Sequence, residues 1–448
     1  MPVLAASQPS AHDWAVHITA DNAVGVPETA PNTVPESIPS SAGTLSSDAL
    51  LAGQADLPAA PAYGKASIGD VLSSAAAVLG AQAYTNVLKL PAAQRICVVL
   101  VDGLGKSLLK QRASHAPFLR GIMAADSGGE HPRNLHAAFP STTATSLTAL
   151  GTGAVPGQHG MVGYDVLDPR QDKVVNLLGN WDSGIDPLRW QPIPTVFEKL
   201  PSDVAATTVS LPKFADSAMT RAALRGSQFS GATSTHARVE QAVEALAATP
   251  KALVYLYWSE LDKAGHHYGA DSPQWERQLE ELDAGMKRLA AAAPSDTLIL
   301  LTADHGMVDI PRRDRIDYSE IPELVEGVRH TAGEPRMVHL YLEPEATPES
   351  RDRLMTAWLE HFRRKAWVLT REQAVAAGYF GTVTDSIANR IGDVLILARE
   401  SVAFYDLRRV RLQAMDVVGQ HGSITKAERE VPLLRIPVTA KKAKGKRR

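Results

Sequence analysis

Three aspartates lie just beyond short apolar runs of the sequence: Asp102, Asp262 and Asp304. Histidines accompany two of them, because His266 follows Asp262 by four residues and His305 follows Asp304 directly. Carboxylate and imidazole groups of this kind suit zinc, with manganese as the next choice. A lone aspartate after a strand is most often an N-cap or turn former, and a lone histidine is usually structural. The prediction of a metal site therefore depends on the three positions occurring together.

A run of hydroxyl residues, Phe139-Pro-Ser-Thr-Thr-Ala-Thr-Ser-Leu-Thr148, is the second candidate for chemistry. Pro140, followed by hydroxyl side chains and then by Ala and Leu, is typical of a helix start. Two interpretations stay open. Either a serine or threonine only caps the helix, or one hydroxyl lies where the helix N–H groups attract an anion. A hydroxyl on a metal ion is more acidic than a free one and can attack at neutral pH.

Apolar runs alternate with amphipathic segments, and this order indicates how the candidate residues are positioned. The sequence predicts strands at 95–101, 252–257, 297–302, 337–342 and 392–398, and helices at 104–125, 273–293 and 348–363. Continuous apolar strands between helices favour an α/β fold with a parallel sheet covered on both faces. In such sheets ligands bind beyond the carboxyl ends of the strands, where the three aspartates would converge.

The composition predicts the domain organisation. Residues 1–65, rich in Ala, Ser and Pro, are expected to form a poorly ordered arm. Residues 66–437 are expected to fold as one catalytic domain, followed by a basic tail at 438–448. Within that domain the less regular segment 307–390 is predicted to be a subdomain inserted between two strands of the main sheet.

Charge and cysteine content exclude several classes of protein. Because 46 Lys and Arg balance 49 Asp and Glu, we expect no nucleic-acid partner, and the basic tail is expected to be a solvated terminus. The single cysteine, Cys97, cannot form a cysteine cluster, so any metal must use His, Asp and Glu. No basic leader and no run of about 18 apolar residues is evident. We therefore expect a cytoplasmic protein without a membrane partner.

Five motifs occur in the order found in type I phosphodiesterase/nucleotide pyrophosphatases, and the chain resembles this family of the alkaline phosphatase superfamily. They are Val101-Asp102-Gly103, Phe139-Pro-Ser-Thr-Thr143, Glu260-Leu-Asp-Lys-Ala-Gly-His266, Thr302-Ala-Asp-His-Gly-Met307 and Gly419-Gln-His-Gly422. The resemblance covers roughly residues 95–435. It implies an alkaline-phosphatase-like sandwich, in which helices flank a central, mostly parallel β-sheet and a small subdomain is inserted.

The resemblance also implies two divalent metal ions and a threonine nucleophile. The implied ligands of one metal are Asp102, Asp304, His305 and Thr143, and those of the other are Asp262, His266 and His421. Thr143 would form a covalent phospho-threonine-type intermediate. The family pattern favours Thr143 over Thr142 as the nucleophile, and His266 over the adjacent His267 as the ligand.

The activity implied by the resemblance is hydrolysis of a phosphate ester or nucleotide by a phosphodiesterase/nucleotide pyrophosphatase. The chain departs from the pattern at Tyr164, which follows His159-Gly-Met-Val-Gly163 where the family usually carries a phosphate-binding asparagine. Tyr164 is therefore the candidate substrate contact, with a longer reach and a different geometry.

Other functions compatible with these residues stay open. A phosphomonoesterase or a phosphonate hydrolase could use the same metals and threonine. A catalytically inactive metal- or phosphate-binding protein is the alternative outside the enzymes. A sulfatase is disfavoured, since its formylglycine arises from a particular Cys or Ser context and Cys97 lies inside an apolar strand.

Overall fold

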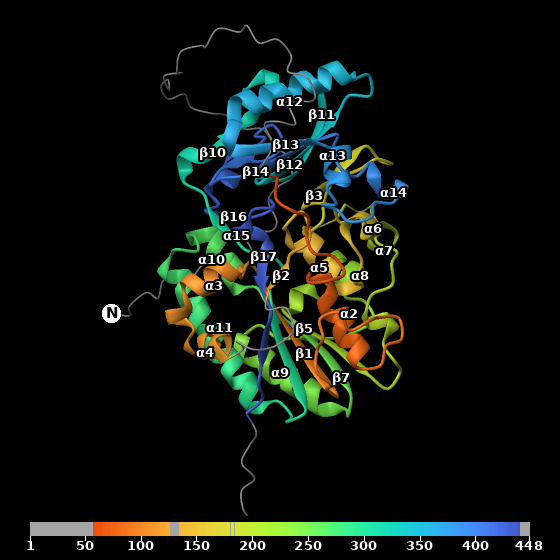
Figure 1. Cartoon of the computed structure of the whole chain (residues 1–448), viewed down its shortest axis with the longest axis vertical. Helices are drawn as coiled ribbons and strands as arrows, with labels where there is room; N and C mark the ends of the chain where they lie inside the picture. The colour runs from red at the N-terminus through yellow and green to blue at the C-terminus, as the bar shows by residue number, and fades with distance from the viewer. Residues whose placement is uncertain (1–56, 126–133, 180, 183, 440–448) are drawn as a thin grey trace, which may run out of the picture.

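The structure is a computed structural model that describes residues 57–125, 134–179, 181–182 and 184–439 (Figure 1). Most of the expected N-terminal arm and the tail from residue 440 lie outside these ranges. Residues 57–65, also expected to be loose, pack against the body. The Tyr63 hydroxyl accepts a hydrogen bond from the Phe139 N–H at 3.1 Å and donates one to the Tyr379 carbonyl at 2.8 Å. The packed chain therefore begins earlier than residue 66.

The main sheet has six strands in the order β18-β8-β1-β7-β5-β6. They are β1 (Arg95–Val101), β5 (Ala205–Ser210), β6 (Gln228–Gly231), β7 (Ala252–Trp258), β8 (Thr297–Thr302) and β18 (Leu434–Ile436). All run parallel except β18, which pairs antiparallel with β8. The central strands are apolar and buried along almost their whole length because helices cover both faces of the sheet.

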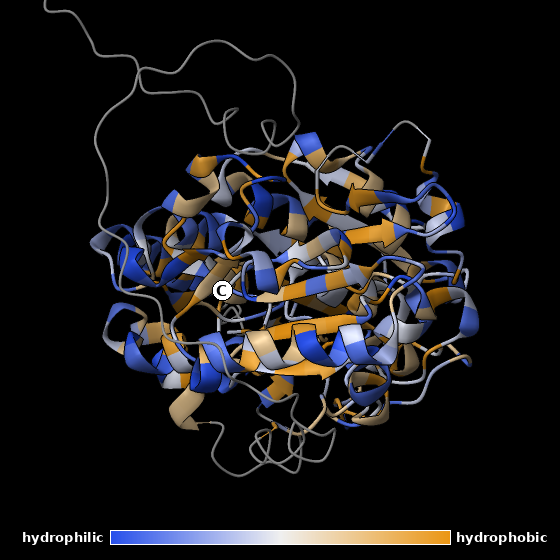
Figure 2. Cartoon of the chain, turned by 90° about the horizontal axis from the view of Figure 1, so that it is seen from above, coloured by the Kyte–Doolittle hydropathy of each residue, from blue (hydrophilic) through white to orange (hydrophobic). Residues whose placement is uncertain are grey.

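Helices lie on the two faces of this sheet in two groups (Figure 1). One group is α2 (Gly69–Val78), α5 (Thr143–Thr152) and α8 (Ala218–Ala223), and the other is α4 (Pro117–Ala125), α9 (Thr235–Ala248) and α11 (Pro273–Ala292). Figure 2 shows apolar strands between helices that turn hydrophilic residues outward. No helix within the described ranges combines the length and apolar character needed to cross a membrane.

The segment expected to be one helix at 104–125 forms two. The helix α3 (Lys106–Gln111) ends before a short 3-10 turn, and α4 begins at Pro117. Proline has no N–H to donate, which is tolerated in the first turn of a helix but breaks its interior. The apolar period continues across the break, so periodicity alone predicts one element.

A second, antiparallel sheet has the order β11-β12-β14-β13 and is covered by α12 (Pro348–Phe362). Its strands are β11 (Val328–Glu334), β12 (Met337–Leu342), β13 (Ala366–Thr370) and β14 (Val394–Ala398). The expectation that 392–398 belongs to the main sheet is wrong, because β14 pairs with β12 and β13. Leu395 and Leu397 face the main core, while Val394 and Ile396 face α12. Because β14 is buried on both faces, its sequence is as continuously apolar as that of a parallel strand.

Short elements connect the two sheets. Among the described residues four two-stranded pairs form, between β2 (Asn134–His136) and β17 (Glu430–Pro432), β3 (Asp165–Asp168) and β4 (Lys173–Asn176), β9 (Val308–Asp309) and β16 (Gly419–Gln420), and β10 (Arg315–Asp317) and β15 (Ala403–Tyr405). The other α-helices of the described part of the chain are α6 (Pro156–His159), α7 (Pro187–Trp190), α10 (Glu260–Tyr268), α13 (Arg371–Ala376), α14 (Asp385–Ala388) and α15 (Lys426–Arg429).

Candidate active site

The carboxyl ends of β1, β7 and β8 meet at one edge of the main sheet, where Asp102 follows β1, Asp304 follows β8, and Asp262 lies in α10 just after β7. In the parallel register Val101 is opposite Trp258, and Leu100 is opposite Thr302. Asp102 therefore follows β1 beside the end of β7, and its N–H donates to the Trp258 carbonyl at 2.9 Å. The prediction that separate strand ends would bring acidic side chains together is confirmed.

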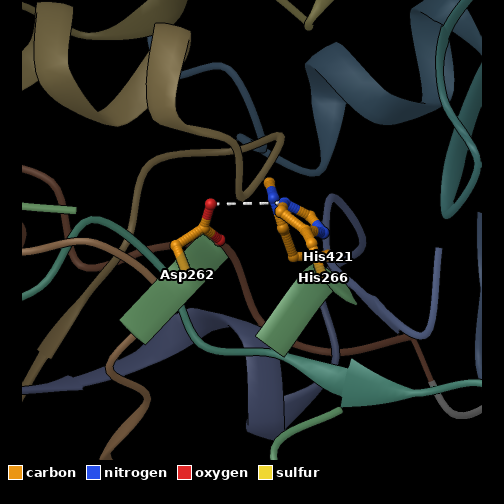
Figure 3. Close-up of side chains that lie close together, drawn as sticks. All are labelled: Asp262, His266 and His421. Atoms are coloured by element: carbon orange, nitrogen blue, oxygen red, sulfur yellow. Dashed lines mark ion pairs between the residues drawn. The ribbon is translucent and has the colours of Figure 1, made fainter. Parts of the chain in front are cut away.

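The helix α10 and the loop after β16 bring one group of three possible ligands together (Figure 3). Asp262 and His266 lie one helical turn apart, with 3.3 Å between Oδ2 and Nε2. His421 follows β16, which pairs with β9 just beyond β8. The ligand atoms of Asp262, His266 and His421 all lie within 4.8 Å of one another. This is the group expected for one metal.

A second group surrounds His305, which is fully buried after β8. Its Nε2 lies 3.3 Å from Asp102 Oδ1 and 3.6 Å from Asp304 Oδ2. The ligand atoms of Asp102, Asp262 and His305 also lie within 4.8 Å of one another. The residues expected at the other metal are thus brought together, and Asp262 lies close to both groups.

Thr143 is the first residue of α5 and points toward the second group. Its Oγ1 lies 3.1 Å from His305 Nε2. Thr142 occupies the N-cap position, but its side chain makes no capping hydrogen bond. The interpretation of this residue as a simple helix cap is therefore not supported, and the threonine expected to be the nucleophile is the one that faces the candidate ligands.

Backbone carbonyls orient all three candidate histidine ligands in the same way. The Nδ1 atoms of His305, His266 and His421 lie 3.0, 2.7 and 2.9 Å from the carbonyl oxygens of Gly306, Gly419 and Ser141 respectively. A carbonyl oxygen can only accept, so each Nδ1 carries a proton and donates it. This arrangement is typical of metal-binding histidines, because it leaves Nε2 for the ion.

Negative charge accumulates in this buried space. Asp102, Asp262 and Asp304 are only 4%, 7% and 0% exposed. Burial and then the charge of Asp102 raise the pKa of Asp262 to about 6, and the same two causes raise the pKa of Asp304 well above its ordinary value. Burial opposes the charged form of His305, but Asp304 and the other carboxylates outweigh it and raise its pKa to about 10. A divalent cation would neutralise this excess of negative charge.

The hydrogen bonds around the carboxylates leave some oxygens without a donor. Asp304 Oδ1 accepts from the N–H groups of Gly103 at 3.2 Å and His305 at 3.0 Å, whereas its buried Oδ2 has no hydrogen-bond donor among the described residues. The same holds for Asp262 Oδ1. Buried carboxylate oxygens without donors are costly unless an ion binds them. The residues present therefore fit a metal site.

Tyr257 is a supporting residue that none of the sequence motifs reveals. Its hydroxyl donates a short hydrogen bond to Asp102 Oδ2 and so fixes this carboxylate. The contact between Tyr257 and Asp102 follows from the strand register, since Tyr257 on β7 is opposite Leu100 on β1. Leu100 and Asp102 are two residues apart and so point to the same face. Only a correct pairing of β1 with β7 would predict the contact.

Two other polar candidates, Tyr164 and His267, do not belong to either group of ligand atoms. Tyr164 is half-buried, and its phenol lies beside the Asn176 side chain. Burial, and then the charge of Asp165, raise the pKa of Tyr164 to about 12. His267 is exposed and packs edge-on against Tyr268 at 4.3 Å between ring centroids. A substrate contact by Tyr164 remains a prediction.

Comparisons with known proteins identify the family. Residues 96–424 match the sequence model of the type I phosphodiesterase / nucleotide pyrophosphatase family. Human ectonucleotide pyrophosphatase/phosphodiesterase family member 5 is 25% identical over 260 residues, which cover 54% of this chain and 51% of that protein. The chain thus spans about half the length of this curated relative.

Solved structures share the fold. Murine ectonucleotide pyrophosphatase / phosphodiesterase 5 superposes with a TM-score of 0.59 at 19% identity, covering 76% of this chain and 87% of that one. Phosphonoacetate hydrolase from Sinorhizobium meliloti 1021 gives 0.57 at 19% identity, with coverage of 78% and 91%. The expected alkaline-phosphatase-like α/β fold is therefore confirmed. Together with the match over residues 96–424, the five ordered motifs establish that the chain belongs to the type I phosphodiesterase/nucleotide pyrophosphatase family.

Proposed function

We propose that the protein is a metal-dependent hydrolase of phosphoric esters, of the phosphodiesterase/nucleotide pyrophosphatase type. The observation that carries this proposal is the approach of the Thr143 hydroxyl to within 3.1 Å of His305 Nε2, at the edge of a buried cluster of carboxylates and histidines. A hydroxyl at a helix N-terminus beside such a cluster is suited to attack an anionic ester. Membership of the family supports the same reaction class.

Two divalent ions, zinc in the first place and manganese as the alternative, would be held by this cluster. We assign Asp102, Asp304, His305 and Thr143 to one ion and Asp262, His266 and His421 to the other. Bound metal ions would stabilise negative charge on the attacking and leaving oxygens of an in-line displacement. The carbonyl-oriented imidazoles and the donor-free carboxylate oxygens support this assignment.

Thr143 performs the displacement in this proposal. Its Oγ1 passes its proton to water and forms a bond to phosphorus while the bond between phosphorus and the leaving-group oxygen breaks. The leaving-group oxygen takes up a proton from water, and a phospho-threonine remains. A water molecule then attacks phosphorus, and the bond to Thr143 Oγ1 breaks and regenerates the hydroxyl. The N–H groups of the first turn of α5 face the same anion and stabilise its charge. The site needs few additional side-chain acids or bases, because electrostatic stabilisation supplies most of the catalysis.

Two lysines support a small anionic substrate such as a phosphate ester or nucleotide. Lys263 follows Asp262 in α10, and its Nζ donates to Ser259 Oγ at 2.8 Å. Burial lowers the pKa of Lys263, and the positive charge of Lys213 acts in the same direction although Glu260 opposes it. Lys213 follows the carboxyl end of β5, so both amines lie on the side of the sheet where the carboxylates converge. A second anionic group on the substrate would match them, which keeps a phosphomonoester or phosphonate as the alternative.

The test compares substrates and variants of the whole chain. Purified protein loaded with zinc or manganese is assayed with bis-p-nitrophenyl phosphate, p-nitrophenyl phosphate and a nucleotide phosphodiester, beside the Thr143→Ala and Thr142→Ala variants. We expect diester hydrolysis that EDTA abolishes and that only Thr143→Ala eliminates. Full activity of Thr143→Ala would refute the nucleophile, and preference for the monoester would favour the alternative. Metal binding without turnover of any ester would indicate an inactive binding protein.

A further inference from the structure

A fully buried ion pair joins the second sheet to the chain around the candidate site. Arg336 lies in the turn between β11 and β12, and Glu428 lies in α15. Both side chains are 0% exposed, with Arg336 Nε 2.7 Å from Glu428 Oε1 and Nη2 2.9 Å from Oε2. Figure 1 shows α15 and β16 between the second sheet above and the main sheet below. A bidentate ion pair of this kind fixes the orientation of both side chains as well as their separation.

Arg336 is also hydrogen-bonded to the backbone that follows the second sheet. Its remaining Nη1 group donates to the carbonyl oxygens of Glu400 at 2.6 Å and Val402 at 2.8 Å, just after β14. The guanidinium therefore has partners on both sides, the Glu428 carboxylate on one and the backbone that leaves the second sheet on the other. Lysine could not make these contacts, because a point charge has no planar fork.

Glu428 in turn holds the segments that carry two candidate ligands. Its Oε1 accepts from the Ser423 N–H at 3.0 Å, and its Oε2 accepts a short hydrogen bond from the Thr425 hydroxyl. Ser423 is two residues beyond His421. The backbone carbonyl of Glu428 accepts from the Gly306 N–H at 2.7 Å, and Gly306 directly follows His305. One acidic residue thus fixes the chain beside both histidines.

Neither Arg336 nor Glu428 belongs to the sets of predicted ligands. Replacing a buried ion pair by apolar residues is often neutral or stabilising, so such a pair is weak as an explanation of stability alone. The ion pair does fix the position of the groups that it contacts. This matters for a metal site, because shifts of a ligand by fractions of an ångström weaken metal binding.

We propose that Arg336 and Glu428 are positioning residues. Through them the second sheet holds the loop 421–425, which carries His421, in the geometry that binds a metal ion. This inference rests on the metal site of the proposed function. It makes the second sheet a part of the site, although that sheet contributes none of the predicted ligands.

The test measures metal affinity as well as activity. Metal-free wild type, Arg336→Lys and Glu428→Gln are titrated with zinc by calorimetry and with cobalt(II) by absorption, whose spectrum reports the coordination geometry. Arg371→Lys is the matched control, since Arg371 donates to Asp393 Oδ1 and to the Ile391 carbonyl within the second sheet, each at 2.8 Å. We expect zinc affinity at the Asp262, His266 and His421 site to fall about 10- to 100-fold in both test variants, with an altered cobalt spectrum, and not in the control.

The outcomes separate the two proposals. If wild type binds no metal, the proposed function fails and this inference fails with it. If wild type binds two ions and both test variants keep its affinity and cobalt spectrum, only the positioning role is refuted. Should Arg336→Lys fail to fold, Glu428→Gln decides, because it keeps the volume of the side chain and one acceptor oxygen. A purely structural pair would lower the melting temperature of the metal-free protein and leave the affinity unchanged.

Discussion

Replacing Asp262 by asparagine is predicted to have opposite effects on the metal-free and the metal-bound protein. Burial and the charge of Asp102 raise the pKa of Asp262 from 3.8 to about 6 in the folded metal-free chain. The folded state therefore holds more protons than the unfolded state between these two values. The free energy of unfolding falls as the pH rises through this window and stays lower above it. The shift corresponds to about 3 kcal/mol at pH 7.

Asparagine does not titrate, so Asp262→Asn removes this loss of folding stability at neutral pH. An unpaired amide N–H costs about 1–3 kcal/mol, but this cost does not depend on pH and cancels when two pH values are compared. Between pH 4 and pH 7 the metal-free wild type should therefore lose about 2.4 kcal/mol more stability than the variant, because part of the loss already occurs below pH 4. Zinc at 100 times its dissociation constant should stabilise wild type by about 2.7 kcal/mol and the variant by much less.

Urea unfolding at pH 4 and pH 7, with chelator and with zinc, measures both quantities. Asp283→Asn is the control, because Asp283 is a buried aspartate whose oxygens accept from the N–H groups of Leu119 at 2.7 Å and Phe118 at 3.1 Å in α4, and it is not one of the candidate ligands. The control should be destabilised equally with and without zinc. If Asp262→Asn follows the pH dependence of wild type, the pKa of Asp262 is not raised by burial. If zinc stabilises the variant as strongly as wild type, Asp262 is not a zinc ligand.

Three further predictions concern single residues. Thr143→Ala should lower kcat roughly 10³-fold or more in a diesterase assay while Thr143→Ser keeps measurable turnover, and equal rates for the two variants would contradict this. Tyr257→Phe should weaken zinc binding about 10- to 100-fold, measured by calorimetry, because Asp102 Oδ2 loses its donor; unchanged affinity would show that the phenol does not support the site. Gly151→Ala should destabilise the fold by about 1–3 kcal/mol in urea unfolding, since its Cβ would lie 1.8 Å from the Ala223 carbonyl oxygen, whereas Gly121→Ala, with open space around it, should not.

The positions of the strand ends could be predicted from sequence because they depend on local patterns. The apolar runs before Asp102 and Asp304 have the length and composition of buried strands, and parallel strands of one sheet end at the same edge. Asp262 and His266 are four residues apart, which places their side chains on one face of α10, although no helix was predicted at this segment. Local patterns in these two strands are therefore sufficient to place Asp102, Asp304 and His305.

Residues from distant loops could not be placed in this way. His421 follows a two-residue strand that has no periodic signal, and only the family resemblance pointed to it. The Arg336–Glu428 pair depends on how the second sheet packs, which no local pattern encodes. The sheet assignment of β14 was wrong for a related reason, since burial on both faces looks alike in a parallel and in an antiparallel strand.

Anomalous X-ray diffraction from crystals soaked in zinc tests most directly whether two metal ions bind between the strand ends and α10. We predict two anomalous peaks about 3.5–4 Å apart. One should be bounded by Asp262, His266 and His421, and the other by Asp102, Asp304 and His305 with Thr143 beside it. A fully loaded crystal with no peak at these side chains, or with zinc bound only elsewhere, would contradict the account.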